Sequence, residues 1–158
     1  MRSSRRLALL ALWAGSLWAS LQIARAPGDW GHALCGPWGC GPPLQALVAC
    51  HLAWFVLLAP AAVLLVRSGL AKPEGLRWIG AAAFSLGLLM SVGMVIHEWI
   101  VWLPSVEESM AAFFWQRCRP VIATSVDLPM VHLVVIGAAL MAAVRGAQQR
   151  ENPDPEVP

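Results

Sequence analysis

Four long apolar stretches alternate with shorter polar segments along this chain of 158 residues. They cover residues 7–24, 44–66, 78–103 and 128–145. About 17–25 apolar residues cross a bilayer as a helix that rises 1.5 Å per residue, so each stretch is long enough. A lipid-exposed backbone must satisfy its own hydrogen bonds, which favours helices. The pattern predicts an all-α fold: an integral membrane, antiparallel four-helix bundle formed by residues 1–147.

Basic residues are distributed unevenly between the two sides of this bundle. Loops on the cytoplasmic side of a membrane are enriched in Lys and Arg. Eight basic residues fall on one side and three on the other: Arg2, Arg5, Arg6, Lys72, Arg67, Arg77, Arg145 and Arg150 against Arg25, Arg117 and Arg119. We therefore expect a multi-pass protein of a bacterial-type inner membrane, with both termini in the cytoplasm and residues 24–43 and 104–127 outside.

Both ends of the chain carry sequence features that affect the expected domain. The Arg-rich start and the first apolar stretch resemble a secretory signal peptide, but Pro27 follows the small-residue site directly and argues against cleavage. We expect the first span to be retained. Residues 148–158 are polar, acidic and Pro-rich, which predicts a disordered cytoplasmic tail.

The composition excludes several classes of protein. Hydrophobic residues make up 58% of the chain and charged residues 13%, whereas soluble domains average about 45–50% and about 25%. An ordinary soluble enzyme and a disordered chain are thereby excluded. The net charge of +2 is too small for a nucleic-acid partner. The expected partners are the lipid bilayer and other membrane-protein subunits.

The first outer loop is rich in Gly and Pro and contains two cysteines. Cys35 and Cys40 bracket Gly-Pro-Trp-Gly, a segment that favours turns and brings the two thiols together. Because the outer side is oxidising, a disulfide is expected. Three interpretations remain open: a structural disulfide, a redox-active pair, and a metal site made of His32, Cys35 and Cys40.

The second outer loop contains signals for a short helix. Ser105 and Glu108 have the spacing of a capping box, which predicts that a helix begins there. Bulky apolar residues follow and the segment ends with Arg117 and Arg119, a pattern typical of an amphipathic helix in the headgroup plane. Alternatively, this helix is a lid that places Arg117, Cys118 and Arg119 above a site in the bundle.

Three histidines fall at a similar predicted depth in three different helices. His51, His97 and His132 lie roughly 6–10 Å below the outer boundary by their positions in the apolar stretches. Ionisable side chains within a membrane are costly, so they are candidates for function. Met94 shares a helix face with His97. Glu98 points about 100° away from His97, so both face inward only in a broad site.

These residues predict a cofactor site near the extracytoplasmic face. Two histidines on facing helices suit haem b, with Arg117 or Arg119 binding its propionates. Three histidines with Met94 suit copper, and three with a carboxylate such as Glu98 suit zinc; His32 is a further candidate ligand. We therefore expect a metal- or haem-binding redox site beneath the disulfide loop.

Two other functions fit the same pattern. The topology resembles that of DsbB-type disulfide-generating oxidases, which have four spans and a cysteine pair before the second. Cys35, Cys40 and Cys118 match the loop positions of that family's cysteines, and the resemblance implies thiol–disulfide exchange with a quinone. The spacing Cys-x4-Cys and the single cysteine of the second loop depart from the family. The third possibility is a non-catalytic accessory or anchor subunit of a membrane complex.

Overall fold

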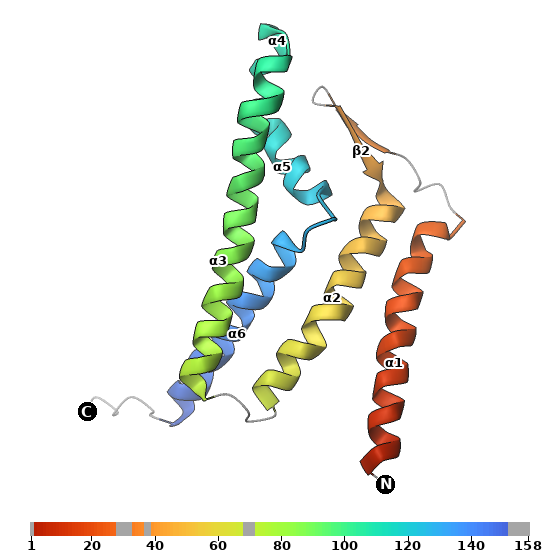
Figure 1. Ribbon diagram of the computed structural model, residues 1–158, viewed down its shortest axis with the longest axis vertical. Coiled ribbons are helices and arrows are strands. Elements are labelled where there is room, and N and C mark those ends of the chain that lie inside the picture. Colours follow the sequence, from red (N-terminus) through yellow and green to blue (C-terminus); the bar gives the residue numbers. More distant parts are fainter. Residues whose placement is uncertain (1, 28–32, 37–38, 68–71, 152–158) are drawn as a thin grey trace, which may run out of the picture.

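The fold consists of long helices, with the two loops predicted to be outside forming a small structure at one end, which we call the outer end. The computed structural model describes residues 2–27, 33–36, 39–67 and 72–151, and these are mostly helical. The long helices are α1 (Arg2–Gln22), α2 (Leu44–Arg67), α3 (Pro73–His97) and α6 (Met130–Glu151). The start of α1 and the end of α6 lie at the same end of the molecule (Figure 1).

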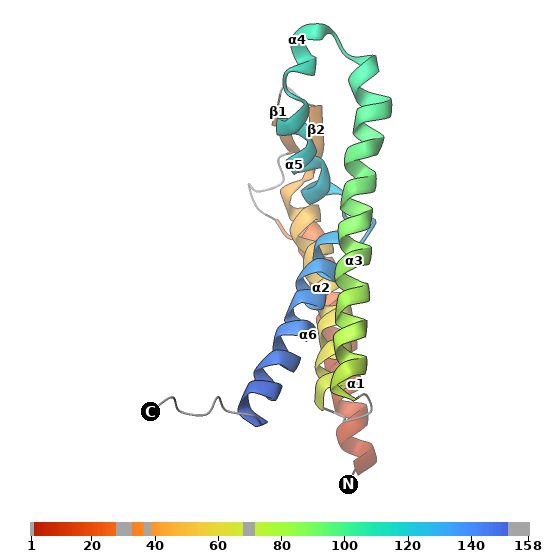
Figure 2. The same cartoon turned by 90° about the vertical axis from the view of Figure 1, so that its left-hand side faces the viewer.

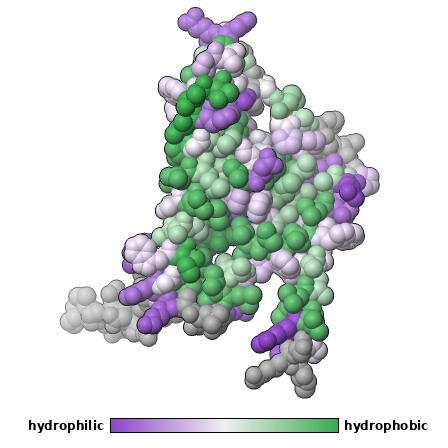
Figure 3. All heavy atoms as spheres, in the orientation of Figure 1, coloured by the Kyte–Doolittle hydropathy of each residue, from purple (hydrophilic) through white to green (hydrophobic). Residues whose placement is uncertain are grey.

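Three helical segments are long and apolar enough to cross a membrane. They are Ser4–Arg25, Leu44–Arg67 and Pro73–Ser105, while a fourth apolar helix, Met130–Gly146, is shorter. Hydrophilic residues gather toward the two ends of the visible face, with apolar residues common between them (Figure 3). These features indicate a membrane protein.

The tightest packing joins α3 to α6 through glycines. A methyl group built on Gly137 would lie 2.5 Å from the Phe84 backbone nitrogen, and one on Gly87 would lie 2.5 Å from the Met130 carbonyl oxygen. Gly80 also faces Gly137, so the two backbones touch over several turns. Gly93, further along α3, has no described atom within 4 Å of such a methyl group.

The other two long helices, α1 and α2, form a second pair. The Trp13 indole N–H donates to the Val56 carbonyl at 2.8 Å, about halfway along both helices. At the outer end, the Gln45 amide donates to the Ala26 carbonyl. Helix α2 also contacts α6 and thereby connects the two pairs.

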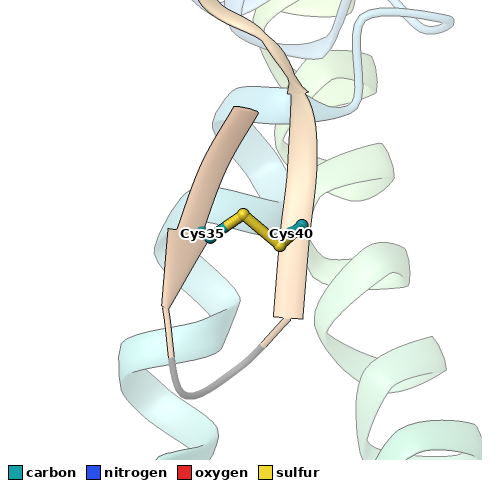
Figure 4. The surroundings of a disulfide bond; sticks show 2 residues. All are labelled: Cys35 and Cys40. Atoms are coloured by element: carbon teal, nitrogen blue, oxygen red, sulfur yellow. A yellow bond between two sulfur atoms is a disulfide. The ribbon is translucent and has the colours of Figure 1, made fainter. Parts of the chain in front are cut away.

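The first outer loop contains a small antiparallel sheet, which the all-α expectation missed. Strands β1 (Ala33–Gly36) and β2 (Gly39–Pro43) pair with Cys35 opposite Cys40. The predicted disulfide joins the two strands (Figure 4). Gly39 begins β2 at a φ of 112°, a conformation that glycine adopts without steric cost.

The second outer loop begins with a change of helix type at the end of α3. A π-helix (Glu98–Trp102) and a 3-10 turn (Leu103–Ser105) follow α3, and then come α4 (Glu108–Ala111) and α5 (Phe114–Thr124). The capping-box prediction is wrong: the Ser105 hydroxyl donates backward to the Trp102 carbonyl at 2.7 Å, and Glu107 is the residue before α4.

Helix α5 returns beside α3 and stands above α6, as both views show (Figures 1 and 2). Its Phe114 and Cys118 side chains are buried against the protein. Helix α6 ends at Glu151, so the first part of the segment predicted to be a tail is helical, and residues 152–158 lie outside the described residues.

Candidate functional site

His51 of α2 and His132 of α6 meet directly. The His51 Nδ1 and His132 Nε2 atoms are 3.1 Å apart, and the ring centroids are 5.0 Å apart. The His51 Nε2 atom lies 2.9 Å from the carbonyl oxygen of Ala123, at the end of α5. This histidine pair, His51 and His132, therefore joins three separate helices.

The Ala123 carbonyl determines which nitrogen of His51 carries a proton. A carbonyl oxygen only accepts, so the His51 Nε2–H donates to it. In a neutral His51 the Nδ1 atom then has a free lone pair, and it accepts from the His132 Nε2–H. This assignment places the remaining lone pair of a neutral His132 on its Nδ1 atom.

The buried member of the pair has an unsatisfied nitrogen. His132 is 1% exposed, and its Nδ1 atom makes no hydrogen bond to any described residue. The Phe55 ring packs edge-on against the imidazole at 4.7 Å, and the Trp54 ring lies 6.4 Å away. Because a buried polar atom without a partner is costly and rare in native proteins, His132 is the side chain that most needs an explanation.

The third histidine lies elsewhere. Gly87 contacts the start of α6, and His97 is ten residues further along α3, which is about 15 Å toward the outer end. The side chain of His97 is 60% exposed, and its Nδ1 atom lies 3.9 Å from the Glu98 Oε1 atom. Met94, one turn below, is half-buried on α3. Among the residues that the structure describes, no three His, Cys, Asp or Glu side chains form a metal-binding group.

Glu98 belongs to a different cluster, at the outer end of α3. Its buried carboxylate accepts from the Arg117 Nε–H at 2.5 Å. The guanidinium also lies over the Trp102 ring, 4.7 Å from its centroid. Glu98 and Trp102 are the first and last residues of the π-helix, so this irregular turn carries two residues that contact Arg117. We refer to Glu98, Trp102 and Arg117 as the outer ion-pair cluster.

The outer ion-pair cluster also contacts the disulfide hairpin. A methyl group on Gly39 would lie 3.5 Å from the Arg117 Nη1 atom, so the start of β2 lies beside the guanidinium. Arg119, two residues along α5, is exposed. Arg117 is thus held by a carboxylate and an indole ring, and a haem propionate would have to compete with Glu98 for it.

The cysteines form no common group. Cys35 and Cys40 are disulfide-bonded, whereas Cys50 and Cys118 are free thiols, Cys118 being buried. Burial raises the pKa of the Cys118 thiol above its usual range; the Glu98 carboxylate raises it further, and Arg117 opposes them. A raised pKa lowers the thiolate fraction, so Cys118 is a poor nucleophile for attack on the disulfide.

Sequence reasoning missed Trp54 as a member of the site. Its indole N–H donates to the Val126 carbonyl at 2.8 Å, just beyond α5. Trp54 lies three residues after His51 and therefore on the same face of α2, a spacing that could have indicated the shared role. His32, a candidate ligand, lies outside the described residues. The chain matches no protein family, no curated protein and no solved structure.

Proposed function

We propose that this protein binds an exchangeable transition-metal ion, zinc or copper, through His51 and His132 near the extracytoplasmic face of a membrane. The observation that carries the proposal is the contact between the two imidazoles, one of which is fully buried. Ionisable groups at this depth are retained chiefly for function. Imidazole nitrogen is a preferred ligand of both metals.

The spacing of the two nitrogens suits a tetrahedral ion. Metal–nitrogen bonds of about 2.0–2.1 Å place two ligands of a tetrahedral ion about 3.3 Å apart. The His51 Nδ1 and His132 Nε2 atoms are separated by 3.1 Å, so a small movement admits the ion. The proton on His132 Nε2 would then move to Nδ1, which makes no hydrogen bond to any described residue.

His51 is oriented as metal-bound histidines are. Such histidines donate their second ring N–H to a carboxylate or backbone carbonyl, which orients the ligating nitrogen. The Ala123 carbonyl fills this role for His51. Two protein ligands leave other coordination positions to water or an exchanging ligand, which is typical of sites that transfer or act on a bound group.

The same spacing disfavours haem. Two axial histidines on one haem iron have their ligating nitrogens about 4 Å apart, with the porphyrin between the rings. The nitrogens of the histidine pair are already in hydrogen-bonding contact. A metal ion therefore fits this arrangement better than haem b.

Metal binding by purified variants tests the proposal. We expect the wild-type protein in mild detergent to bind about one zinc or copper(I) ion per chain in equilibrium dialysis. His51→Ala and His132→Ala should each reduce the affinity at least about tenfold, because outer-shell and ligand changes have effects of this size or larger. His97→Ala is the matched control and should bind as the wild type does.

The other outcomes are equally informative. A wild-type protein that binds neither ion contradicts the proposal. Binding by all three variants that equals wild-type binding contradicts it as well. Loss of binding in His97→Ala as well would favour the three-histidine site predicted from the sequence. Far-ultraviolet circular dichroism of each variant shows whether a loss reflects unfolding.

A further inference from the structure

The apolar part of α6 is short for a membrane crossing. Met130–Gly146 has 17 residues, about 25 Å of helix, against about 30 Å of hydrocarbon. The 24 residues of α2 span about 36 Å, and the 33 residues of Pro73–Ser105 about 50 Å. Either α6 stops short of the outer boundary or the residues before it complete the crossing.

Neighbouring helices place the start of α6 below the outer boundary. Gly87 contacts Met130, and α3 continues for ten more residues to His97, about 15 Å. Independently, His132 pairs with His51, which lies seven residues, about 10 Å, beyond the start of α2 at Leu44. By either measure, residues 125–129 lie roughly 10 Å deeper than the outer ends of α2 and α3.

Irregular backbone at this depth needs hydrogen-bond partners, and the structure supplies them. Trp54 donates to the Val126 carbonyl and His51 to the Ala123 carbonyl, both from α2. The Ser125 hydroxyl donates to the Val121 carbonyl at 2.6 Å. Non-helical segments within membranes are tolerated where protein buries them or where they line a water-filled cavity.

Asp127 indicates that water reaches this segment. Its side chain is exposed and lies in the middle of residues 125–129. A carboxylate facing lipid at that depth would be costly, whereas one facing water is not. The break between α5 and α6 therefore combines an exposed acidic group with the carbonyl that orients His51.

We propose that the fourth crossing is discontinuous, formed by the end of α5 together with α6, and that residues 125–129 line a water-filled recess through which a metal cation reaches the histidine pair from outside. The access role rests on the proposed function. The recess does not, because it follows from helix lengths, register and an exposed carboxylate. The exposed Asp127, which lies among these residues, attracts the hydrated cation.

Cysteine accessibility tests the recess without metal. Cys50→Ser and Cys118→Ser remove the free thiols, and Asp127→Cys is then treated in proteoliposomes with a membrane-impermeant maleimide. The control is Leu89→Cys. Leu89 lies on α3 two residues from Gly87, at the depth of the start of α6, and its side chain is 72% exposed. We expect labelling of Asp127→Cys and none of Leu89→Cys.

Every other labelling pattern of these two variants contradicts the proposed recess. Labelling of both cysteines means that this depth lies outside the membrane, and labelling of neither means that the break is closed to water. Ala123→Cys, at the exposed end of α5, replaces Asp127→Cys if that variant does not fold. It should label in the same way.

Binding kinetics test the access role. We expect Asp127→Asn to slow zinc association about threefold at low ionic strength, with an unchanged amount bound at equilibrium and no difference at high salt. Glu108→Gln removes an equal charge from exposed α4 and should have no effect. Equal rates for Asp127→Asn and the wild type contradict the access role. A wild type that binds no zinc overturns the proposed function, and labelling still decides the recess.

Discussion

The two ends of the long α3 helix are held to their neighbours by different interactions. In its first half, α3 contacts α6 backbone to backbone at Gly80 and Gly137, with no polar side chain needed. At its outer end, the buried Glu98 carboxylate binds the partly exposed Arg117 of α5 through an ion pair. The first contact depends on the absence of side chains, and the second depends on the charge of particular ones.

This difference separates stability from chemistry. Close packing at glycines brings the backbones of α3 and α6 into van der Waals contact. Glycine has no reactive side chain. The outer half contains the histidine pair and the outer ion-pair cluster, whose ionisable side chains must be paired or hydrated to be tolerated. A ligand or proton can act on the outer half, whereas the inner half determines how the helices stand relative to one another.

Removing one partner of the outer ion-pair cluster should have the largest effect. Arg117→Met leaves the buried Glu98 carboxylate without its guanidinium partner, and breaking a buried pair in this way costs up to about 3–5 kcal/mol of unfolding free energy. The measurement is denaturant unfolding in detergent. Arg119→Met, an exposed cation on the same helix, is the matched control and should change little.

A double variant distinguishes charge burial from lost packing. Glu98→Gln combined with Arg117→Met removes both charges, so it should be more stable than Arg117→Met alone. If Arg117→Met is no less stable than Arg119→Met, the outer end is not held by this pair.

Adding one methyl group at the glycine contact between α3 and α6 should have the next largest effect. Gly137→Ala places a methyl group 2.5 Å from the Phe84 backbone nitrogen, and the backbone cannot yield as a flexible side chain would. Overpacking of this kind costs about 1–3 kcal/mol. Gly93→Ala, where the described neighbours leave open space, should be neutral or slightly stabilising in its helix. Equal stability of the two variants would contradict the close approach of α3 to α6.

The helices and the shared depth of two histidines could be predicted because each depends on local pattern. Apolar runs locate the long helices, and helix rise places His51 and His132 at one depth. His97 was misplaced because its depth was counted within its own apolar run, whereas the Gly87 contact shows that α3 continues far past the start of α6. That register depends on packing between helices, which a single sequence does not record.

The irregular segments were beyond sequence reasoning for a related reason. The Ser105 and Glu108 spacing satisfies a capping box, yet the hydroxyl of Ser105 bonds to Trp102 instead. The π-helix from Glu98 to Trp102 carries no sequence signal of its own. It is accompanied by the contacts of both residues with Arg117, nineteen residues after Glu98, so the local pattern was outweighed by a tertiary interaction.

The smallest effect concerns reactivity and leaves stability unchanged. The raised pKa of Cys118 reduces its thiolate, so in a Cys50→Ser background its maleimide labelling at pH 8 should be slower in the folded protein than after unfolding. Below the thiol pKa, the thiolate fraction grows tenfold per pH unit, so the labelling rate should still be rising beyond pH 9, the thiol's ordinary pKa.

Two substitutions in the outer ion-pair cluster should move this pH profile in opposite directions. Glu98→Gln removes a charge that raises the Cys118 pKa, so the labelling curve should shift to lower pH. Arg117→Met removes the opposing cation, so the curve should shift to higher pH, even though the protein is less stable. Local opening of the structure would instead accelerate labelling in both variants. Opposite shifts would therefore show that electrostatics from the outer ion-pair cluster, and not looser packing, controls the thiol.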